Sequence, residues 1–275
     1  MAEERSPFEF EQQLGSETEK ELVAALAAAF VFATGSIIYS QFNPDTDFET
    51  IQQRFRNKFS ETLPYLSLVS QQSITNDLER SPVPNSVSVD NSQFNKPEEV
   101  FNENLIFIIS SNLAMYQLLR QIAIEREWTN EQLARRLKSY YGLTAERLKS
   151  VLLVEMSLLK ENTNKKLREQ IIQNKIDSLV DWRLRLIATR ISTGVIEGSK
   201  DAAYEFLAQR GQINSGDYEK IWRSVVDENT TNICLNSNNM TAPLGGTFNN
   251  GLRHPPAFPP VHNCRSSITI RKRRL

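Results

Sequence analysis

The feature that most constrains the fold is a run of helical signals from Pro97 to Gly211. Pro97 followed by Glu98 and Glu99 predicts a helix start, because proline suits the first turn and acidic side chains face the positive end of the helix dipole. Apolar residues then recur three and four positions apart, which indicates helices that each bury one face. The centre of the chain therefore predicts a mostly helical fold.

Local signals divide this run into several helices. Thr129, with Gln132 three residues on, predicts a capping box, and Gly142 predicts the end of that helix. Thr144 predicts the start of the next helix, which the polar turn 162–164 interrupts.

A long segment, Lys165 to Gln209, follows and predicts one long helix or two in line, ended by Gly211. Gly194 and Gly198 lie four residues apart on its apolar face. A glycine inside a helix costs about 1 kcal/mol relative to alanine. The two glycines therefore predict a close approach of another helix.

The first 61 residues predict helices. Leu22 to Tyr39 is uncharged, and its eighteen residues are the lower limit of a bilayer-spanning length. Because Lys and Arg do not cluster at its flanks, we interpret it as a helix buried on all sides rather than a membrane span. Residues 1–21 carry seven acidic side chains against two basic ones, which excludes a signal peptide. Asp47 to Ser60 predicts a short helix with one apolar face, formed by Phe48, Ile51, Phe55 and Phe59.

The segment 62–96 differs in composition from its neighbours. It is polar and rich in proline, serine and asparagine, and its later part shows no periodicity. This composition is typical of loops, so we expect an extended arm or a linker.

The pattern changes again after Gly211. Tyr218 to Val226 predicts a strand, and Ser267 to Lys272 alternates apolar and polar residues as a second strand does. We expect these two strands to pair and to bracket a short helix or turn at 227–235 and a Pro/Gly-rich loop at 240–260. The expected fold class is α+β, mostly α, with four segments: N-terminal helices (1–61), the arm (62–96), a helical region (97–211) and a small C-terminal domain (212–275).

All histidines and cysteines of the chain lie in that C-terminal domain. The sequence has 2 Cys and 2 His, namely Cys234, His254, His262 and Cys264. This count excludes a disulfide-rich secreted scaffold. Four nitrogen and sulfur ligands suit a closed structural zinc site. A Cys234–Cys264 disulfide would close the same loop, and a third alternative is that the four residues do neither.

Acidic residues are missing from this part of the chain. Residues 229–275 contain no Asp or Glu, so a catalytic zinc would lack a carboxylate base from its own segment. The sequence therefore favours a protein that is not an enzyme.

The order of C-terminal features carries a resemblance to a known family. A tryptophan-bearing strand is followed by Asp227, a Thr/Cys turn, a Gly-bearing loop and a Pro-Pro-x-His-x-Cys-Arg block before the last strand. The residues are Ile221-Trp222, Val226-Asp227, Thr230-Thr231, Cys234 and Pro259-Pro260-x-His262-x-Cys264-Arg265. This order is similar to that in the phage head morphogenesis family, the Mu F-like minor capsid proteins. The preceding helix, Arg185 to Arg190, also resembles the family.

The chain departs from the family pattern at two places. Many members carry a second cysteine three residues after the first, where this chain has Ser237. Many also have Arg-Thr-Glu in the long helix, where this chain has Arg190-Ile191-Ser192. Without that second cysteine, a four-ligand metal site would need His254 as one of its ligands.

The resemblance implies a structural virion protein, present in several copies in the phage head near the portal vertex and assembled in the host cytoplasm. The implied partners are the portal protein, the major capsid protein, or both, and packaged DNA. The implied roles are head assembly and DNA packaging or delivery. Two alternatives stay open: a metal-dependent nuclease or hydrolase that uses the Cys/His segment, and a DNA-binding accessory protein.

A basic C-terminal tail bears on the last of these alternatives. Arg271, Lys272, Arg273 and Arg274 suit contact with phosphate or with an acidic protein surface, and a solvated tail without a partner is the other alternative. The formal net charge of the chain is −1, so its total charge does not favour extensive nucleic-acid wrapping.

Overall fold

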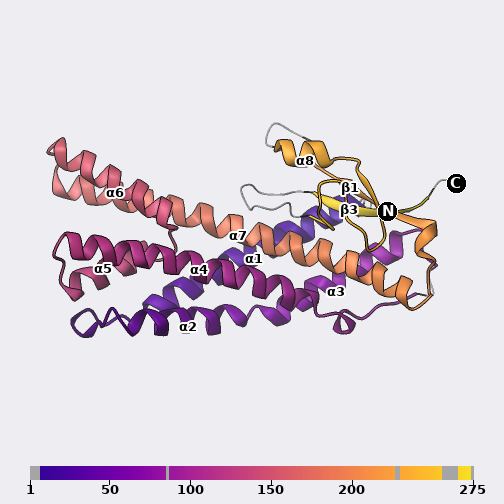
Figure 1. The fold of residues 1–275 in the computed structure, drawn as a ribbon, viewed down its shortest axis with the longest axis horizontal. Helices are drawn as coiled ribbons and strands as arrows, with labels where there is room; N and C mark the ends of the chain where they lie inside the picture. Colours follow the sequence, from indigo (N-terminus) through magenta and orange to yellow (C-terminus); the bar gives the residue numbers. More distant parts are fainter. Residues whose placement is uncertain (1–6, 85–86, 227–229, 256–265, 274–275) are drawn as a thin grey trace, which may run out of the picture. The chain divides into compact units, whose positions relative to one another are not determined.

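The computed structural model describes residues 7–84, 87–226, 230–255 and 266–273. These residues form long helices and a small antiparallel sheet, so the fold is α+β and mostly α, as predicted (Figure 1). The helices are α1 (Pro7–Thr34), α2 (Asp47–Ser60), α3 (Leu63–Arg80), α4 (Lys96–Glu125), α5 (Asn130–Tyr140), α6 (Ala145–Lys160), α7 (Lys165–Gln209) and α8 (Asn232–Ser237). The strands are β1 (Tyr218–Arg223), β2 (Thr241–Pro243) and β3 (Ser267–Lys272), and the short 3-10 turns are η1 (Tyr39–Gln41), η2 (Asn91–Gln93) and η3 (Ser215–Asp217).

The chain forms two compact units, each built from segments that are far apart in the sequence. Unit 1 comprises Met1–Leu22, Thr62–Asn102 and Leu186–Leu275, and unit 2 comprises Val23–Glu61 and Glu103–Arg185. The unit boundaries fall inside α1, α4 and α7, so these three helices contribute residues to both units. Four consecutive segments, as expected from the sequence, do not describe this organisation.

Unit 2 has an aromatic core. The predicted helix α2 is confirmed with its bounds, and its four predicted apolar residues are all buried. The ring of Phe48 stacks on Tyr116 of α4 at 3.9 Å, and that of Phe55 stacks on Phe30 of α1 at 5.0 Å. The capping box of α5 is also confirmed: Thr129 Oγ1 accepts from the Gln132 amide at 3.2 Å, and Gln132 Oε1 accepts from the Thr129 amide at 2.9 Å.

The prediction that Leu22–Tyr39 is buried on all sides is wrong. Leu22, Leu26 and Ala29 are fully buried, but Val31 is 71% exposed and Phe32 is 45% exposed. The buried residues recur at helical spacing, so α1 has one buried stripe in spite of its uncharged sequence. Among the helices of the described residues, α4 is the one that is long and apolar enough to cross a membrane, and 33% of its apolar window is buried.

The prediction of an extended arm over residues 62–96 is wrong for its first half, which forms α3. This helix buries Leu66, Val69, Ile74 and Leu78, along with two serines. The Ser70 hydroxyl donates to Ser199 Oγ of α7 at 2.8 Å, and the Ser73 hydroxyl donates to the Ile196 carbonyl at 3.3 Å. Serine therefore acts here as a small residue at a helix–helix contact rather than as a loop former.

The rest of that segment packs onto its own unit. Val83 and Val89 are buried in a cluster with Leu78 of α3, Tyr204 of α7 and Ile270 of β3. Gln71 of α3 donates to the Val89 carbonyl at 3.0 Å. These contacts make the irregular segment after α3 a part of the core of unit 1.

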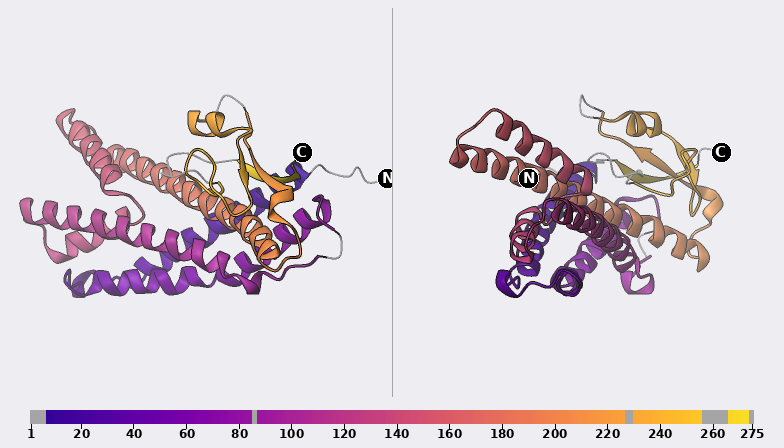
Figure 2. Two further views of the ribbon diagram at one scale, coloured as in Figure 1. Left: turned by 45° about the vertical axis from the view of Figure 1, so that its right-hand side comes forward. Right: turned by 60° about the vertical axis from the view of Figure 1, so that its left-hand side comes forward.

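The C-terminal sheet has the strand order β2-β1-β3, with both pairs antiparallel. The predicted pairing of the two longer strands is confirmed, although β1 ends at Arg223, and β2 was not predicted. Figure 2 shows the sheet and α8 from two further directions. Trp222 of β1 is fully buried and meets the ring of Phe248 edge-on at 5.4 Å. Together with Ala242 and Ile268 they form a second small core.

The helix before the sheet, α7, is continuous over its whole length. Of the two predicted alternatives for 165–209, one helix or two in line, the first is confirmed.

Candidate functional site: a buried ion network beside the sheet

Charged residues lie on the buried face of α7 where an apolar stripe would be expected. Glu197, Lys200 and Asp201 are 3%, 1% and 3% exposed. Their spacing of three and four residues places them on one side of the helix. A charge in a protein interior is costly unless it is paired, so each must have a partner. The partners come from β1, β3 and the loop after β2. We call Glu197, Lys200, Asp201, Glu205, Lys220 and Arg253 the ion network.

The first part of the ion network holds the outer edge of β3. Glu197 Oε2 accepts from the Ile268 amide at 2.7 Å, and Lys200 Nζ donates to the Ile268 carbonyl at 3.1 Å. The two side chains also pair with each other at 2.8 Å.

Strand register explains why the Ile268 peptide groups need these partners. Ile268 is opposite Trp222, whose amide and carbonyl bond toward the β2 side, to Met240 and Asn239. In an antiparallel pair, this makes Trp222 and Ile268 a non-hydrogen-bonded pair, so the Ile268 groups point away from β1. Glu197 and Lys200 therefore replace a missing neighbouring strand at a buried sheet edge.

The second part of the ion network joins β1 to the loop. Lys220 Nζ lies 2.6 Å from Asp201 Oδ1 and donates to the Arg253 carbonyl at 2.6 Å. Arg253 pairs with Asp201 Oδ2 at 3.0 Å and with Glu205 Oε2 at 2.5 Å. Both oxygens of Asp201 are thus occupied by cations.

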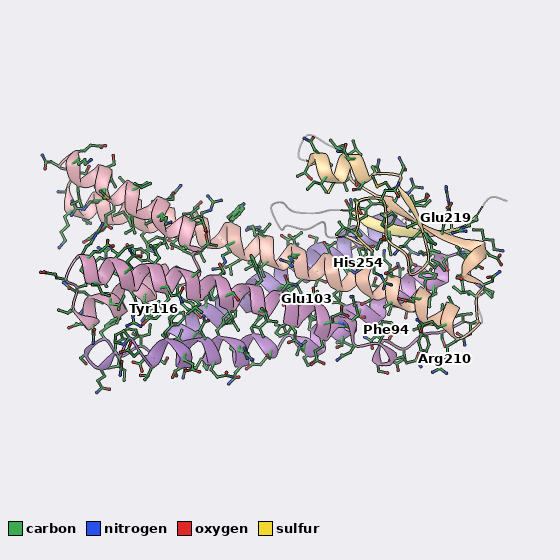
Figure 3. The ribbon with its side chains drawn as sticks, viewed as in Figure 1. Phe94, Glu103, Tyr116, Arg210, Glu219 and His254 are labelled. Atoms are coloured by element: carbon green, nitrogen blue, oxygen red, sulfur yellow. The ribbon has the colours of Figure 1, made fainter. Side chains whose placement is uncertain are left out.

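His254 lies beside the ion network, against α7 (Figure 3). A side-chain carbon added to Gly198 would lie 3.2 Å from two ring atoms of His254 and 2.8 Å from Lys96 Cε. The predicted close approach at Gly198 is therefore real, but the described neighbours are two side chains rather than a helix backbone. His254 Nδ1 is 2.5 Å from the Pro255 carbonyl, which makes Nδ1 the protonated nitrogen.

The electrostatics of the site follow from its burial. Burial lowers the pKa of Lys220 below its usual value, and the adjacent Asp201 carboxylate partly opposes this. Burial likewise lowers the pKa of His254. The hydrogen bond to the Pro255 carbonyl and the Asp201 carboxylate oppose this effect, while Lys96 and Lys220 add to it. Within the ion network three cations face three carboxylates, so its charges balance. Such an arrangement holds α7, β1 and the loop after β2 together. Both carboxylate oxygens of Asp201 have a cation partner.

Serine side chains tie the family-like residues to the sheet. The Ser224 hydroxyl, at the end of β1, donates to the Cys234 carbonyl of α8 at 2.7 Å and lies 3.0 Å from Ser266 Oγ. Ser237 is 1% exposed and accepts from Asn250 Nδ2 at 2.9 Å. This hydrogen bond joins α8 to the loop after β2.

The structure describes only part of the predicted metal or disulfide site. Cys234 is buried in α8, and His254 lies against α7, while His262 and Cys264 fall outside the described residues. Within the ranges described, no group of three or more His, Cys, Asp or Glu side chains could hold a metal ion. The structural zinc and the Cys234–Cys264 disulfide therefore stay predictions.

The basic tail is partly described. Arg271, Lys272 and Arg273 are all exposed, and Arg271 pairs with Glu219 of β1 at 2.7 Å. Arg274 lies outside the described residues. Three of the four predicted contact residues are thus on the surface, two of them outside the described ion pairs.

Sequence reasoning missed the ion network. One sequence signal could have found it. Tyr218, Lys220 and Trp222 are spaced two residues apart in β1, so their side chains face the same side of the strand. A lysine in that pattern predicts a buried acidic partner. The acidic residues absent from 229–275 are supplied by α7, through Asp201 and Glu205.

Comparison with known proteins adds no relative. No family model, curated protein or solved structure matches this chain. The similarity to the phage head morphogenesis family therefore rests on the sequence residues named above.

Proposed function

We propose that this chain is a structural minor head protein of a tailed phage, associated with the portal vertex and the inner capsid. It acts in head assembly and in DNA packaging or delivery, and its partners are the portal protein, the major capsid protein, or both. The observation that carries the proposal is the placement of the family-like residues. Trp222 is buried in a small core with Ala242, Phe248 and Ile268, and Cys234 is buried as well. Two side chains of the ion network, Glu197 and Lys200, bond to the backbone of Ile268 in that core.

The chemistry of the ion network supports a structural rather than a catalytic role. A general acid or base must reach a proton on its substrate. Both Asp201 oxygens are paired with cations, and Glu197 bonds to the Ile268 amide and to Lys200. These contacts join α7, β1, β3 and the loop, which is what a module that docks as a rigid body requires.

The exposed tail supports a contact with packaged DNA or with an acidic surface of a head protein. Lys272 and Arg273 stand at the end of β3 and are exposed. Each phosphate contact of this kind makes the slope of log K for DNA binding against log salt concentration more negative by about 0.9.

The test is whether the protein is found in phage heads. Full-length protein expressed with the phage's portal and capsid proteins should co-purify with portal rings or procapsids. The variant Lys272→Gln/Arg273→Gln should bind DNA or heads more weakly while folding normally. Absence from both immature and mature particles would refute the proposal. Divalent-metal-dependent DNA cleavage that His262→Ala abolishes would instead favour the nuclease alternative.

A further inference from the structure

The interior of unit 2 contains a buried arginine that has no carboxylate partner among the described residues. Arg183 of α7 is 3% exposed, and its Nη1 donates to three neutral oxygens. These are Asn112 Oδ1 at 2.9 Å, the Gly142 carbonyl at 2.6 Å and the Leu143 carbonyl at 3.1 Å. The two carbonyls belong to the turn between α5 and α6, where Gly142 has a φ of +100°. One end of the guanidinium therefore fixes this turn.

The other end of the guanidinium has no acceptor among the described residues. Arg183 Nε and Nη2 are buried and make no hydrogen bond there. The planar guanidinium places the N–H bonds of Nε and Nη2 side by side along the edge opposite Nη1, which is the fork that anions accept from. A buried donor without a partner is costly, and a buried charge without a partner costs more. This edge of the guanidinium therefore offers two donors and a full positive charge together.

The neighbouring groups do not supply the missing negative charge. The hydroxyl of Tyr141 donates to Gln52 Oε1 at 3.0 Å. Burial raises the pKa of Tyr141 well above its usual value, so the phenol stays neutral at physiological pH. Asn112 itself is fully buried and neutral.

We infer that the Nε and Nη2 edge of Arg183 forms a binding site for a small monovalent inorganic anion of the chloride class. Arg183 Nε and Nη2 donate to the ion, which balances the buried guanidinium charge. A single-atom ion needs less space than a polyatomic one, which suits a side chain that is 3% exposed. Water could satisfy the donors but would leave the charge uncompensated, so the anion is favoured.

Solution stability gives the first test. In sodium chloride, the melting temperature of unit 2 should rise by about 3–6 °C for each tenfold increase above the dissociation constant. Sodium gluconate at equal ionic strength should give no such rise, because gluconate is too large for the site. The neutral variant Arg183→Met should lose the difference between the two salts. Arg185→Met is the matched control on the same helix, since Arg185 pairs with Asp181 at the surface, and it should keep the difference.

Crystals of the full chain grown in sodium bromide give a second test that does not depend on a variant's folding. The anomalous signal should show bromide within about 3.5 Å of Arg183 Nε and Nη2. Equal melting temperatures in chloride and gluconate, together with water but no bromide at this position, would overturn the inference.

Discussion

Replacing Lys220 by methionine tests the central contact of the ion network. Methionine keeps the length and apolar stem of lysine but removes its charge, so Asp201 loses the cation at 2.6 Å. Removing one partner of a buried pair costs about 3–5 kcal/mol, because the other charge is left in a low dielectric. Arg253 still contacts Asp201 Oδ2, so we expect the lower value, about 3 kcal/mol of unfolding free energy.

The assay needs a reporter for unit 1 alone. The chain has three tryptophans, and Trp128 and Trp182 belong to unit 2. In a background with both replaced by phenylalanine, the fluorescence of buried Trp222 follows the unfolding of unit 1 in urea. Lys220→Met should lower the unfolding free energy by about 3 kcal/mol. Lys272→Met, which removes an exposed lysine of the same sheet, should change it by less than about 0.5 kcal/mol.

A double-mutant cycle separates the interaction energy of the Lys220–Asp201 pair from the general effect of each substitution on the core. Asp201→Asn should also destabilise unit 1, and the combined variant should be less destabilised than the sum by about 1–3 kcal/mol. Additive effects, or a loss below about 1 kcal/mol for Lys220→Met, would refute the view that this pair is buried and coupled.

Three further outcomes follow from named contacts. Gly198→Ala should destabilise unit 1 by about 1 kcal/mol because His254 blocks the added methyl, whereas Gly15→Ala, whose nearest neighbours are 3.9 Å away, should stabilise it in the same urea assay. Because the pKa of His254 is lowered on folding, the unfolded chain binds the proton more readily, so unfolding free energy should fall as pH drops through about 6.5. His254→Gln should reduce that loss between pH 7.5 and 5.5, and an unchanged slope would contradict the burial of His254. Thr129→Ala should cost unit 2 about 1 kcal/mol in urea unfolding, since it removes the cap of α5, and no loss would contradict the capping box.

The sequence predicted the elements whose signals are local. The helix bounds of α2 and α5, the end of α7 near Gly211 and the strand β3 all follow from caps, glycines and periodicity within a few residues. Local signals left open whether 165–209 forms one helix or two in line. The same reasoning failed at α3, because serine favours a loop locally but also fits a close helix contact. The contact of Ser70 with Ser199 joins residues 129 positions apart, and no local pattern contains it.

What the sequence determined by itself is the mostly helical fold, the two paired strands and the family-like order of residues around Trp222. Only the tertiary structure decided how the charged residues are used. Lys220 and Asp201 are 19 residues apart, and Lys200 and Ile268 are 68 apart. Charge type alone does not show which side chains are buried, because a lysine or an aspartate is ordinarily exposed to water. The fold buries these residues together, where the low dielectric makes their pairing necessary and fixes the sheet to α7.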